Sequence, residues 1–133
     1  MQSLSGNWNL VCFDCSVPRV ISSRGQIDRE QMEKLDGFLQ AAGAASRNVL
    51  VMGHYPLVYP DGVRIGWDHE LPGRSRVLEL LAKHGARAYL HGHTHQGWAL
   101  DHAGIIHLNC CSAGMMDTRS GRMPGFVVID VEN

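Results

Sequence analysis

The sequence predicts an α/β fold built on a mixed β-sheet. Two short apolar runs each end in a Gly-His pair, at Gly53–His54 and at Gly92–His93. An amphipathic stretch with helical spacing precedes each run, and an alternating stretch with a central turn follows the second. Alternating strands and helices are typical of parallel strands, and a hairpin adds antiparallel ones. With 133 residues, the chain has the length of one domain or of a piece of one.

The composition excludes several classes of protein. A net charge of −1 provides no basic field, so we expect no nucleic-acid-binding patch and no attraction to an anionic membrane. No apolar run approaches the roughly 20 residues that span a bilayer. The stretch Met1–Gly6 lacks the basic and apolar regions of a signal peptide. The predicted location is therefore cytoplasmic.

The first third of the chain predicts one strand and one helix. The strand covers Trp8–Phe13, where side chains alternate in character, and a turn-rich loop follows up to Gly25. Asp28 and Gln31 fit a capping box, in which the first residue accepts a hydrogen bond at the start of a helix. The helix ends at Gly43, and its apolar face carries Met32, Leu35, Phe38, Leu39 and Ala42.

The middle of the chain predicts the first Gly-His strand, Asn48–Met52. Its continuous apolar run is typical of a strand that is buried on both faces. Pro56 cannot continue a central strand, and a long loop rich in Pro, Gly and aromatic residues covers Tyr55–Gly73. Loops of this length are often functional, although a packed surface loop is the alternative. The candidate substrate contacts in this loop are Arg64, Trp67, Asp68 and His69.

The second half of the chain predicts a helix, the second Gly-His strand, a hairpin and a closing strand. The helix ends at Gly85, and the strand covers Arg87–Leu90. The hairpin covers Trp98–Leu108 with its turn at Asp101–Gly104, and the closing strand covers Phe126–Val131. Helical spacing places five residues on one face of the helix, namely Val77, Leu78, Leu80, Leu81 and His84.

The histidines that follow the two strands are candidate metal ligands. A neutral imidazole nitrogen is available to bind a metal ion near neutral pH. Alternate side chains of an extended chain point the same way, so His93 and His95 face one point and His91 could join them. His54 follows the other strand, and ligands collect at the carboxyl ends of strands in open α/β sheets. The alternative for an isolated His-x-His is a His-rich surface loop.

Four cysteines leave two interpretations open. Cys12 and Cys15 have the Cys-x-x-Cys spacing of zinc and redox sites. The chain from Trp8 to Asp14 alternates like a strand, however, and an extended chain directs Cys12 and Cys15 to opposite faces. Cys110 and Cys111 are adjacent and do not form a second such pair. We expect buried free thiols, with a zinc ribbon as the alternative.

The pair Gly53–His54, followed by the Gly-His-Thr-His of Gly92–His95, resembles the last two signature motifs of the calcineurin-like metallophosphoesterases. The resemblance covers the chain from about the first predicted strand to its end. It implies a four-layer α/β/β/α sandwich with a mixed sheet. This chain would supply the C-terminal half of that sandwich, as a single partial domain over residues 1–133.

The same resemblance implies a cofactor and a reaction. The cofactor is a pair of divalent metal ions (Mn, Fe or Zn), with His54 and His93 on one ion and His95 on the other. The reaction is two-metal hydrolysis of a phosphomonoester or phosphodiester, for which we identify no catalytic acid or base. The surroundings of Trp67–Asp68 and of His91–Gln96 are similar to the cyclic-nucleotide phosphodiesterase branch, which makes a cyclic nucleotide a candidate substrate.

The family's first three motifs have no counterpart before His54. These motifs are Asp-x-His, Gly-Asp-x-x-Asp, and Gly-Asn-His followed by Asp or Glu. Gly6–Asn7 is a candidate degenerate form of the third motif, in which Trp8 stands in place of the His. The chain is therefore either an incomplete metal-dependent phosphoesterase, inactive alone, or a non-catalytic scaffold or interaction module with at most one weak metal site. We expect self-association or a missing N-terminal half, because the uncovered sheet face would carry Leu10, Cys12, Val49 and Val51 or their alternates.

Overall fold

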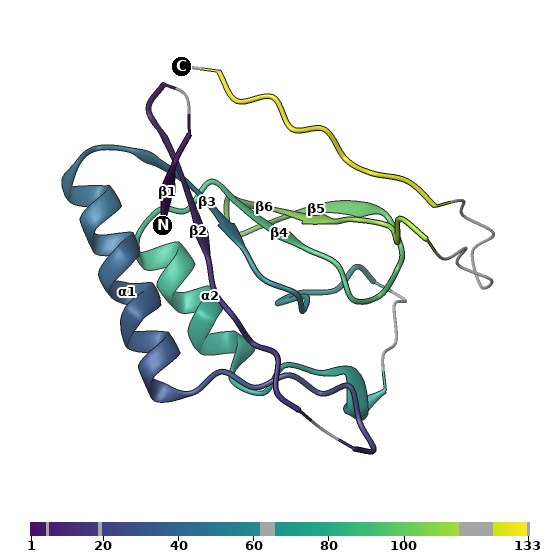
Figure 1. The fold of residues 1–133 in the computed structure, drawn as a ribbon. Coiled ribbons are helices and arrows are strands. Elements are labelled where there is room, and N and C mark those ends of the chain that lie inside the picture. The colour runs from purple at the N-terminus through teal and green to yellow at the C-terminus, as the bar shows by residue number, and fades with distance from the viewer. Residues whose placement is uncertain (5, 19, 62–65, 115–123, 133) are drawn as a thin grey trace.

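The computed structural model describes residues 1–132 except 5, 19, 62–65 and 115–123. Its strands are β1 (Gln2–Ser3), β2 (Trp8–Cys12), β3 (Asn48–Met52), β4 (Ala88–His91), β5 (Trp98–His102) and β6 (Ile105–Asn109). Within these residues the strands form one six-stranded sheet in the order β1-β2-β3-β4-β6-β5 (Figure 1). The inner strands are parallel, and β1 and β5 pair antiparallel at the edges. The predicted mixed sheet is confirmed.

The helical elements are α1 (Arg29–Ala44), η1 (Trp67–His69) and α2 (Arg74–Lys83). Both α-helices lie on one side of the sheet (Figure 1). The side chain of Asp28 caps α1 as predicted, because it accepts a hydrogen bond from the Gln31 N–H at 2.8 Å. The helix continues one residue past the predicted stop at Gly43, since this glycine does not adopt a positive φ. Among the described helices, none is long and apolar enough to cross a membrane.

The hydrophobic core lies between the helices and the sheet. The register of four neighbouring strands aligns four fully buried residues in one row, Val11, Val51, Tyr89 and His107. The helices add Leu35, Leu39, Ala42, Val77 and Leu81 to the same core. Phe38 was predicted on this face of α1 but is 40% exposed. It precedes Leu39 by one residue, or about 100° around the helix, which turns it away from the sheet.

The opposite face of the sheet is apolar and carries no helix. It presents Leu10, Cys12, Leu50, Met52, Leu90, Ile106 and Leu108. The expectation named Leu10, Cys12, Val49 and Val51 or their alternates; Leu10 and Cys12 lie on this face, and the alternates Leu50 and Met52 take the place of the two valines. The register pairs Leu10 with Leu50, and successive side chains of a strand alternate between faces. The two valines therefore point to the helices, where they belong to the core.

The C-terminal residues 124–132 lie over this open face without forming a helix or strand (Figure 1). The predicted strand Phe126–Val131 is therefore wrong. A segment that lies over the face of a sheet reaches no strand edge with which its backbone could pair. Its apolar alternation directs Val127 and Ile129 to the sheet side, where both line a pocket together with Met52 and Leu90. The Trp8 Nε1–H ties the end of the segment by donating to the Glu132 carbonyl oxygen at 2.9 Å.

Candidate metal centre

Two parallel strands bring the Gly-His turns together. β3 and β4 are parallel neighbours, so His54 and His93 leave the sheet at the same edge. Backbone hydrogen bonds join the two turns. The Gly53 N–H donates to the Leu90 carbonyl oxygen at 3.1 Å, and the Gly92 N–H donates to the His54 carbonyl oxygen at 3.1 Å. The sheet thus fixes the position of one turn relative to the other.

Close packing requires a glycine at position 53. A Cβ on Gly53 would lie 2.5 Å from the Tyr89 hydroxyl oxygen and 2.8 Å from the Phe13 ring. The Tyr89 ring cannot easily give way, because its hydroxyl donates to the Tyr55 carbonyl oxygen at 2.8 Å inside a close-packed core. The glycine therefore lets the chain pass over the core and place His54 at its edge.

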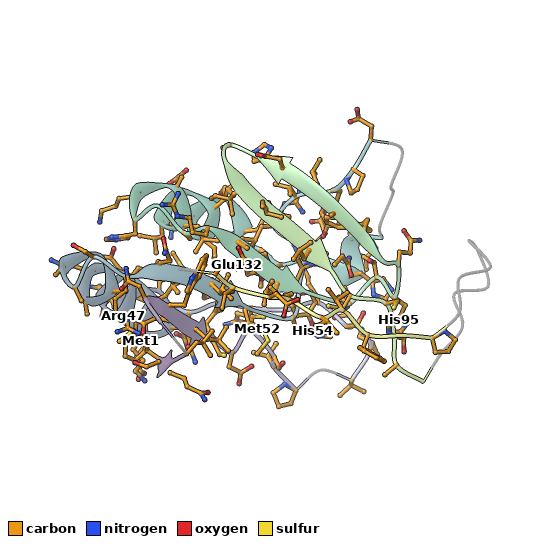
Figure 2. All side chains as sticks on the ribbon, turned by 90° about the horizontal axis from the view of Figure 1, so that it is seen from above. Met1, Arg47, Met52, His54, His95 and Glu132 are labelled. Carbon is orange, nitrogen blue, oxygen red and sulfur yellow. The ribbon has the colours of Figure 1, made fainter. Side chains whose placement is uncertain are left out.

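His54, His93 and His95 line one pocket of about 470 Å³. His54 Nε2 and His93 Nδ1 are 3.1 Å apart, and the two rings meet nearly edge to face with 5.0 Å between their centroids. Figure 2 shows His95 far from Met1 and Arg47, with His54 between Met52 and His95. The structure thus gathers the three predicted residues in one place, and their binding of metal ions stays a prediction.

The backbone of Gly92–His95 differs from the extended chain that the sequence suggested. His93 and His95 have φ angles of 69° and 58°. This left-handed region costs a residue with a Cβ about 1–2 kcal/mol. The two imidazoles therefore reach the pocket through a turned backbone, and the alternation of an extended chain does not explain their convergence. Such strain persists where the surrounding structure holds it.

Burial keeps the imidazoles of His54 and His93 neutral. Burial lowers the pKa of His54, and the neighbouring His95 lowers it further. The pKa of His93 falls to about 4, first through burial and then through the neighbouring His54 and His69. A neutral imidazole is the form that binds a metal ion. The pocket therefore offers its nitrogen ligands near neutral pH without first losing protons.

His69, a predicted substrate contact on η1, lies beside His93 but is not among the described residues that line the pocket. Its ring centroid lies 5.2 Å from that of His93, and its Nδ1 shares a hydrogen bond of 2.6 Å with the Ser23 hydroxyl. Trp67 of the same turn is 68% exposed. Two further candidates fall outside the described part of the structure, namely the residue Arg64 and the side chain of Asp68. His69 is thus the predicted contact that the structure places beside the site.

His91, the candidate third partner, is a core residue that borders the pocket. Its side chain is buried, and its ring lies against those of Tyr89 and Trp98, with centroid distances of 5.2 Å and 4.9 Å. Burial, and then the nearby His107, lowers the pKa of His91 to about 3. In the described part of the chain, no three His, Cys, Asp or Glu side chains are arranged to hold one metal ion. His91 therefore completes no such group.

The carboxyl end of β6 supplies lining residues that the sequence analysis missed. Cys110, Cys111 and Ser112 follow β6 as the Gly-His pairs follow β3 and β4. Because ligands collect at the carboxyl ends of strands, the position of Cys110 and Cys111 after a predicted strand was enough to indicate that they line the site. The sequence analysis considered the cysteines only as a zinc or redox pair. Burial raises the pKa of Cys110, and Cys111 adds to the rise. Val127 and Ile129 border the pocket from the C-terminal segment.

Two further groups of sequence candidates do not line the pocket. Cys12 is exposed and Cys15 is buried, and both are free thiols, so the expectation of burial is right for Cys15 and wrong for Cys12. Gly6–Asn7 precedes β2 at the amino ends of the parallel strands, where the Asn7 side chain donates to the Ser46 carbonyl oxygen at 2.8 Å. The candidate degenerate motif therefore contributes nothing to a site at the carboxyl ends.

Comparisons with known proteins identify the family and the fold. The sequence model of the calcineurin-like phosphoesterases matches residues 7–97, whereas no curated protein matches the sequence. The chain is similar to a dimetal phosphatase from Danio rerio, with 25% identity and a TM-score of 0.52 over 65% of this chain. It shares the fold of GAP50, the anchor in the inner membrane complex of Plasmodium, with 16% identity and a TM-score of 0.54 over 77% of this chain. It spans 27% and 35% of those two structures.

Proposed function

The chain belongs to the calcineurin-like phosphoesterase family, and we propose that it carries part of a two-metal centre for the hydrolysis of phosphoesters. The observation that carries the proposal is the meeting of His54 and His93, with 3.1 Å between His54 Nε2 and His93 Nδ1. Two nitrogens that bind one tetrahedral zinc ion at about 2.0–2.1 Å lie about 3.3 Å apart. The spacing of this pair therefore suits two ligands of one ion.

In the proposed centre, His54 and His93 bind one divalent ion (Mn, Fe or Zn) and His95 binds the second. The bound ions supply a water of lowered pKa and neutralise charge on the phosphoryl group. The chain itself would hold the three imidazoles in place, and burial keeps those of His54 and His93 neutral before the ions bind. His69 lies beside His93 and is the described residue best placed to contact the substrate.

The described residues do not make a complete centre. Those that line the pocket include no carboxylate, and no three potential ligands of the described part are arranged to hold one ion. Catalytic zinc sites use about three protein ligands for each ion. Without a negatively charged ligand between them, two nearby cations also repel each other. We therefore propose that this chain alone hydrolyses phosphoesters poorly or not at all.

The proposed substrate is a phosphomonoester or phosphodiester, with a cyclic nucleotide as one candidate. The proposed partner is a second copy of the chain or a segment that supplies the missing ligands. The apolar open face supports a partner, because Met52 and Ile106 on it are 41% and 48% exposed. Contiguous exposed apolar surface on a soluble protein is typical of an interface.

A non-catalytic scaffold is the second candidate function. It is supported by the same shortage of ligands, since the described part of the chain offers no three-residue metal group. Such a module would keep the sheet and hold at most one metal ion weakly. It differs from the first candidate in a measurable way, because it would not bring phosphate to a metal ion.

Binding of phosphate to a protein-bound ion tests the proposal without requiring turnover. Mn²⁺ and inorganic phosphate are added to the purified chain, and the phosphorus NMR line width of phosphate is measured. We expect paramagnetic broadening beyond that of free Mn²⁺, and we expect His93→Ala to remove the excess. The exposed His102 provides the matched control, because His102→Ala removes an imidazole from β5, where it does not line the pocket.

Hydrolysis of an aryl phosphodiester is measured on the same samples. We expect slow or undetectable turnover with Mn²⁺, because the bridging carboxylate is missing from the described ligands. Rapid metal-dependent turnover that His93→Ala abolishes would show that the ligand set of this chain is complete. Equal broadening in the unmodified chain and in His93→Ala would favour the scaffold.

A further inference from the structure

We propose that Asn109 is a positioning residue that holds the Gly92–His95 loop in its metal-binding shape by acting through Thr94. The inference rests on the proposed function, in which His93 and His95 bind metal ions. It concerns a part of the site that neither the motifs nor the resemblance identifies. The proposal rests on a hydrogen bond between the buried Asn109, which ends β6, and the half-buried Thr94, which follows β4.

Asn109 occupies a firmly held position. It is the last residue of β6 and is 1% exposed. The register places it between His91 of β4 on one side and Trp98 of β5 on the other. The next N–H along the chain, from Cys110, donates to the His91 carbonyl oxygen at 2.8 Å. The backbone that carries the Asn109 amide is therefore fixed by both neighbouring strands.

The Asn109 amide holds the middle of the loop. Its Nδ2 donates to the Thr94 hydroxyl oxygen at 2.6 Å. Thr94 is the residue between the two proposed ligands, and its own N–H donates to the Gly92 carbonyl oxygen at 2.8 Å. One bond from the sheet and one within the loop thus fix the same residue. The loop cannot shift at Thr94 without breaking one of them.

The loop needs such a tie because its backbone is strained on both sides of Thr94. His93 and His95 have φ angles of 69° and 58°, and each has a conformational strain energy that an ordinary backbone does not have. If the tie to Asn109 is lost, either residue can relax and swing its imidazole away from the pocket. The hydrogen bond of Asn109 therefore stabilises the convergence that metal binding requires.

In this proposal Asn109 does not contact the metal ions. Neither Asn109 nor Thr94 is among the described residues that line the pocket, so neither is proposed as a ligand. Groups that orient metal ligands from outside the first layer typically change metal affinity by about 10–100-fold when they are mutated. We expect a loss of that order from Asn109→Ala.

The test measures Zn²⁺ binding by calorimetry in a set of single and double variants of the chain. The relevant signal is the part of the binding that His93→Ala removes, which separates the pocket from the thiols of Cys12 and Cys15 outside its lining. We expect Asn109→Ala and Thr94→Val each to weaken this component by about tenfold or more. The double variant should be no weaker than either single one, because both remove the same bond. Thr94→Ser keeps a hydroxyl and should restore affinity.

Asn9 provides the matched control for the loss of a buried amide. It is also 1% exposed, and its side chain accepts a hydrogen bond from the Ser3 hydroxyl at 3.3 Å, on β2 rather than at the pocket. Asn9→Ala should lower stability without changing the His93-dependent affinity. If Asn109→Ala and Asn9→Ala leave Zn²⁺ affinity equally unchanged, the positioning role is overturned.

Hydrogen exchange of the Thr94 amide gives a readout that does not depend on metal. We expect faster exchange in Asn109→Ala than in the unmodified chain or in Asn9→Ala, measured without metal. If the unmodified chain shows no His93-dependent binding, the proposed metal centre is wrong. The exchange rates then still decide whether Asn109 holds the loop, and equal rates in Asn109→Ala and Asn9→Ala would refute it.

Discussion

Contacts that fix the backbone matter more to this site than the conformational preferences of the histidines themselves. His93 and His95 both adopt a left-handed φ, which an isolated His rarely does. The positions are held by neighbours, with Gly53 allowing the chain to pass the core and Asn109 anchoring Thr94. Substitutions of these neighbours should therefore disturb the site while every proposed ligand stays in the sequence.

Gly53→Ala should destabilise the protein by about 1–3 kcal/mol, the usual cost of forcing atoms into a packed core. The new Cβ would meet the Tyr89 hydroxyl at 2.5 Å and the Phe13 ring at 2.8 Å. Gly43→Ala is the control, since a Cβ at that helical glycine meets nothing within 4 Å and should stabilise α1 by about 0.5–1 kcal/mol. Urea unfolding of both variants checks the prediction, and shifts of the same sign would contradict it.

The buried His107 should make stability depend on pH. Burial, and then the neighbouring His102, lowers the pKa of His107 to about 4, whereas an imidazole in an unfolded chain has a pKa of about 6.5. Between these values the unfolded chain binds a proton that the folded one does not. The free energy of unfolding therefore falls as the pH drops from about 7 towards 4.

Urea unfolding at several pH values measures this dependence. His107→Leu should reduce the change of the free energy of unfolding with pH. The remaining change should come in part from the neighbouring His91, which has a pKa of about 3. His102→Leu should change the slope less than His107→Leu does, because it removes only the smaller of the two causes that lower the pKa of His107. An identical slope in the unmodified chain and in His107→Leu would show that His107 does not contribute.

At the scale of elements, the site depends on α1 and α2 covering one face of the parallel strands. The strands place the Gly-His turns at one edge of the sheet. The turns keep these positions only while the helices stay packed on one face of the sheet. α1 contributes Leu35, Leu39 and Ala42 to that cover. Its one-sided burial is the reason why adjacent residues of this helix should respond very differently to the same substitution.

Leu39→Ala should destabilise the protein by about 2–5 kcal/mol, because it opens a cavity in the core. Leu39 is fully buried, whereas the preceding Phe38 is 40% exposed. Phe38→Ala is therefore the matched control and should cost clearly less, although the aromatic side chain is larger. Thermal unfolding of the two variants makes the comparison. A larger loss from Phe38→Ala would mean that α1 is rotated from the described position.

At the scale of the whole molecule, the sheet is covered by helices on one face and only in part on the other. The C-terminal segment lies over the open face, yet Phe126 and Val128 of that segment are themselves 85% and 71% exposed. The open face and the segment together form an apolar surface in need of a partner. We expect the purified chain to self-associate.

Ile106→Lys should weaken this self-association, because it places a charge on the open face. Ile106 is 48% exposed there. Phe38→Lys gives the control, since it adds the same charge at a similarly exposed apolar residue on α1. Size-exclusion chromatography with light scattering, run over a range of concentrations, should show a lower mass for Ile106→Lys alone. A compact monomer of the unmodified chain at micromolar concentration would refute the expected association.

The sequence by itself determined the elements that depend on local pattern. Asp28 predicted the start of α1, and the apolar run Asn48–Met52 predicted β3. The alternation around Asp101–Gly104 predicted the hairpin of β5 and β6. Each of these signals acts over a few residues, within reach of one hydrogen bond or one turn. The two Gly-His motifs also indicated the family, because their spacing along the chain carries the information.

The tertiary structure alone decided which residues share a face and which segments meet. Val49 and Val51 face the helices because of the register with β2, and register is set by neighbouring strands rather than by the strand itself. Phe126–Val131 looks like a strand in sequence but lies over a sheet face, where no edge is available for pairing. Asn109 meets Thr94 because β6 lies beside β4, a contact between residues on separate strand ends that no local pattern records.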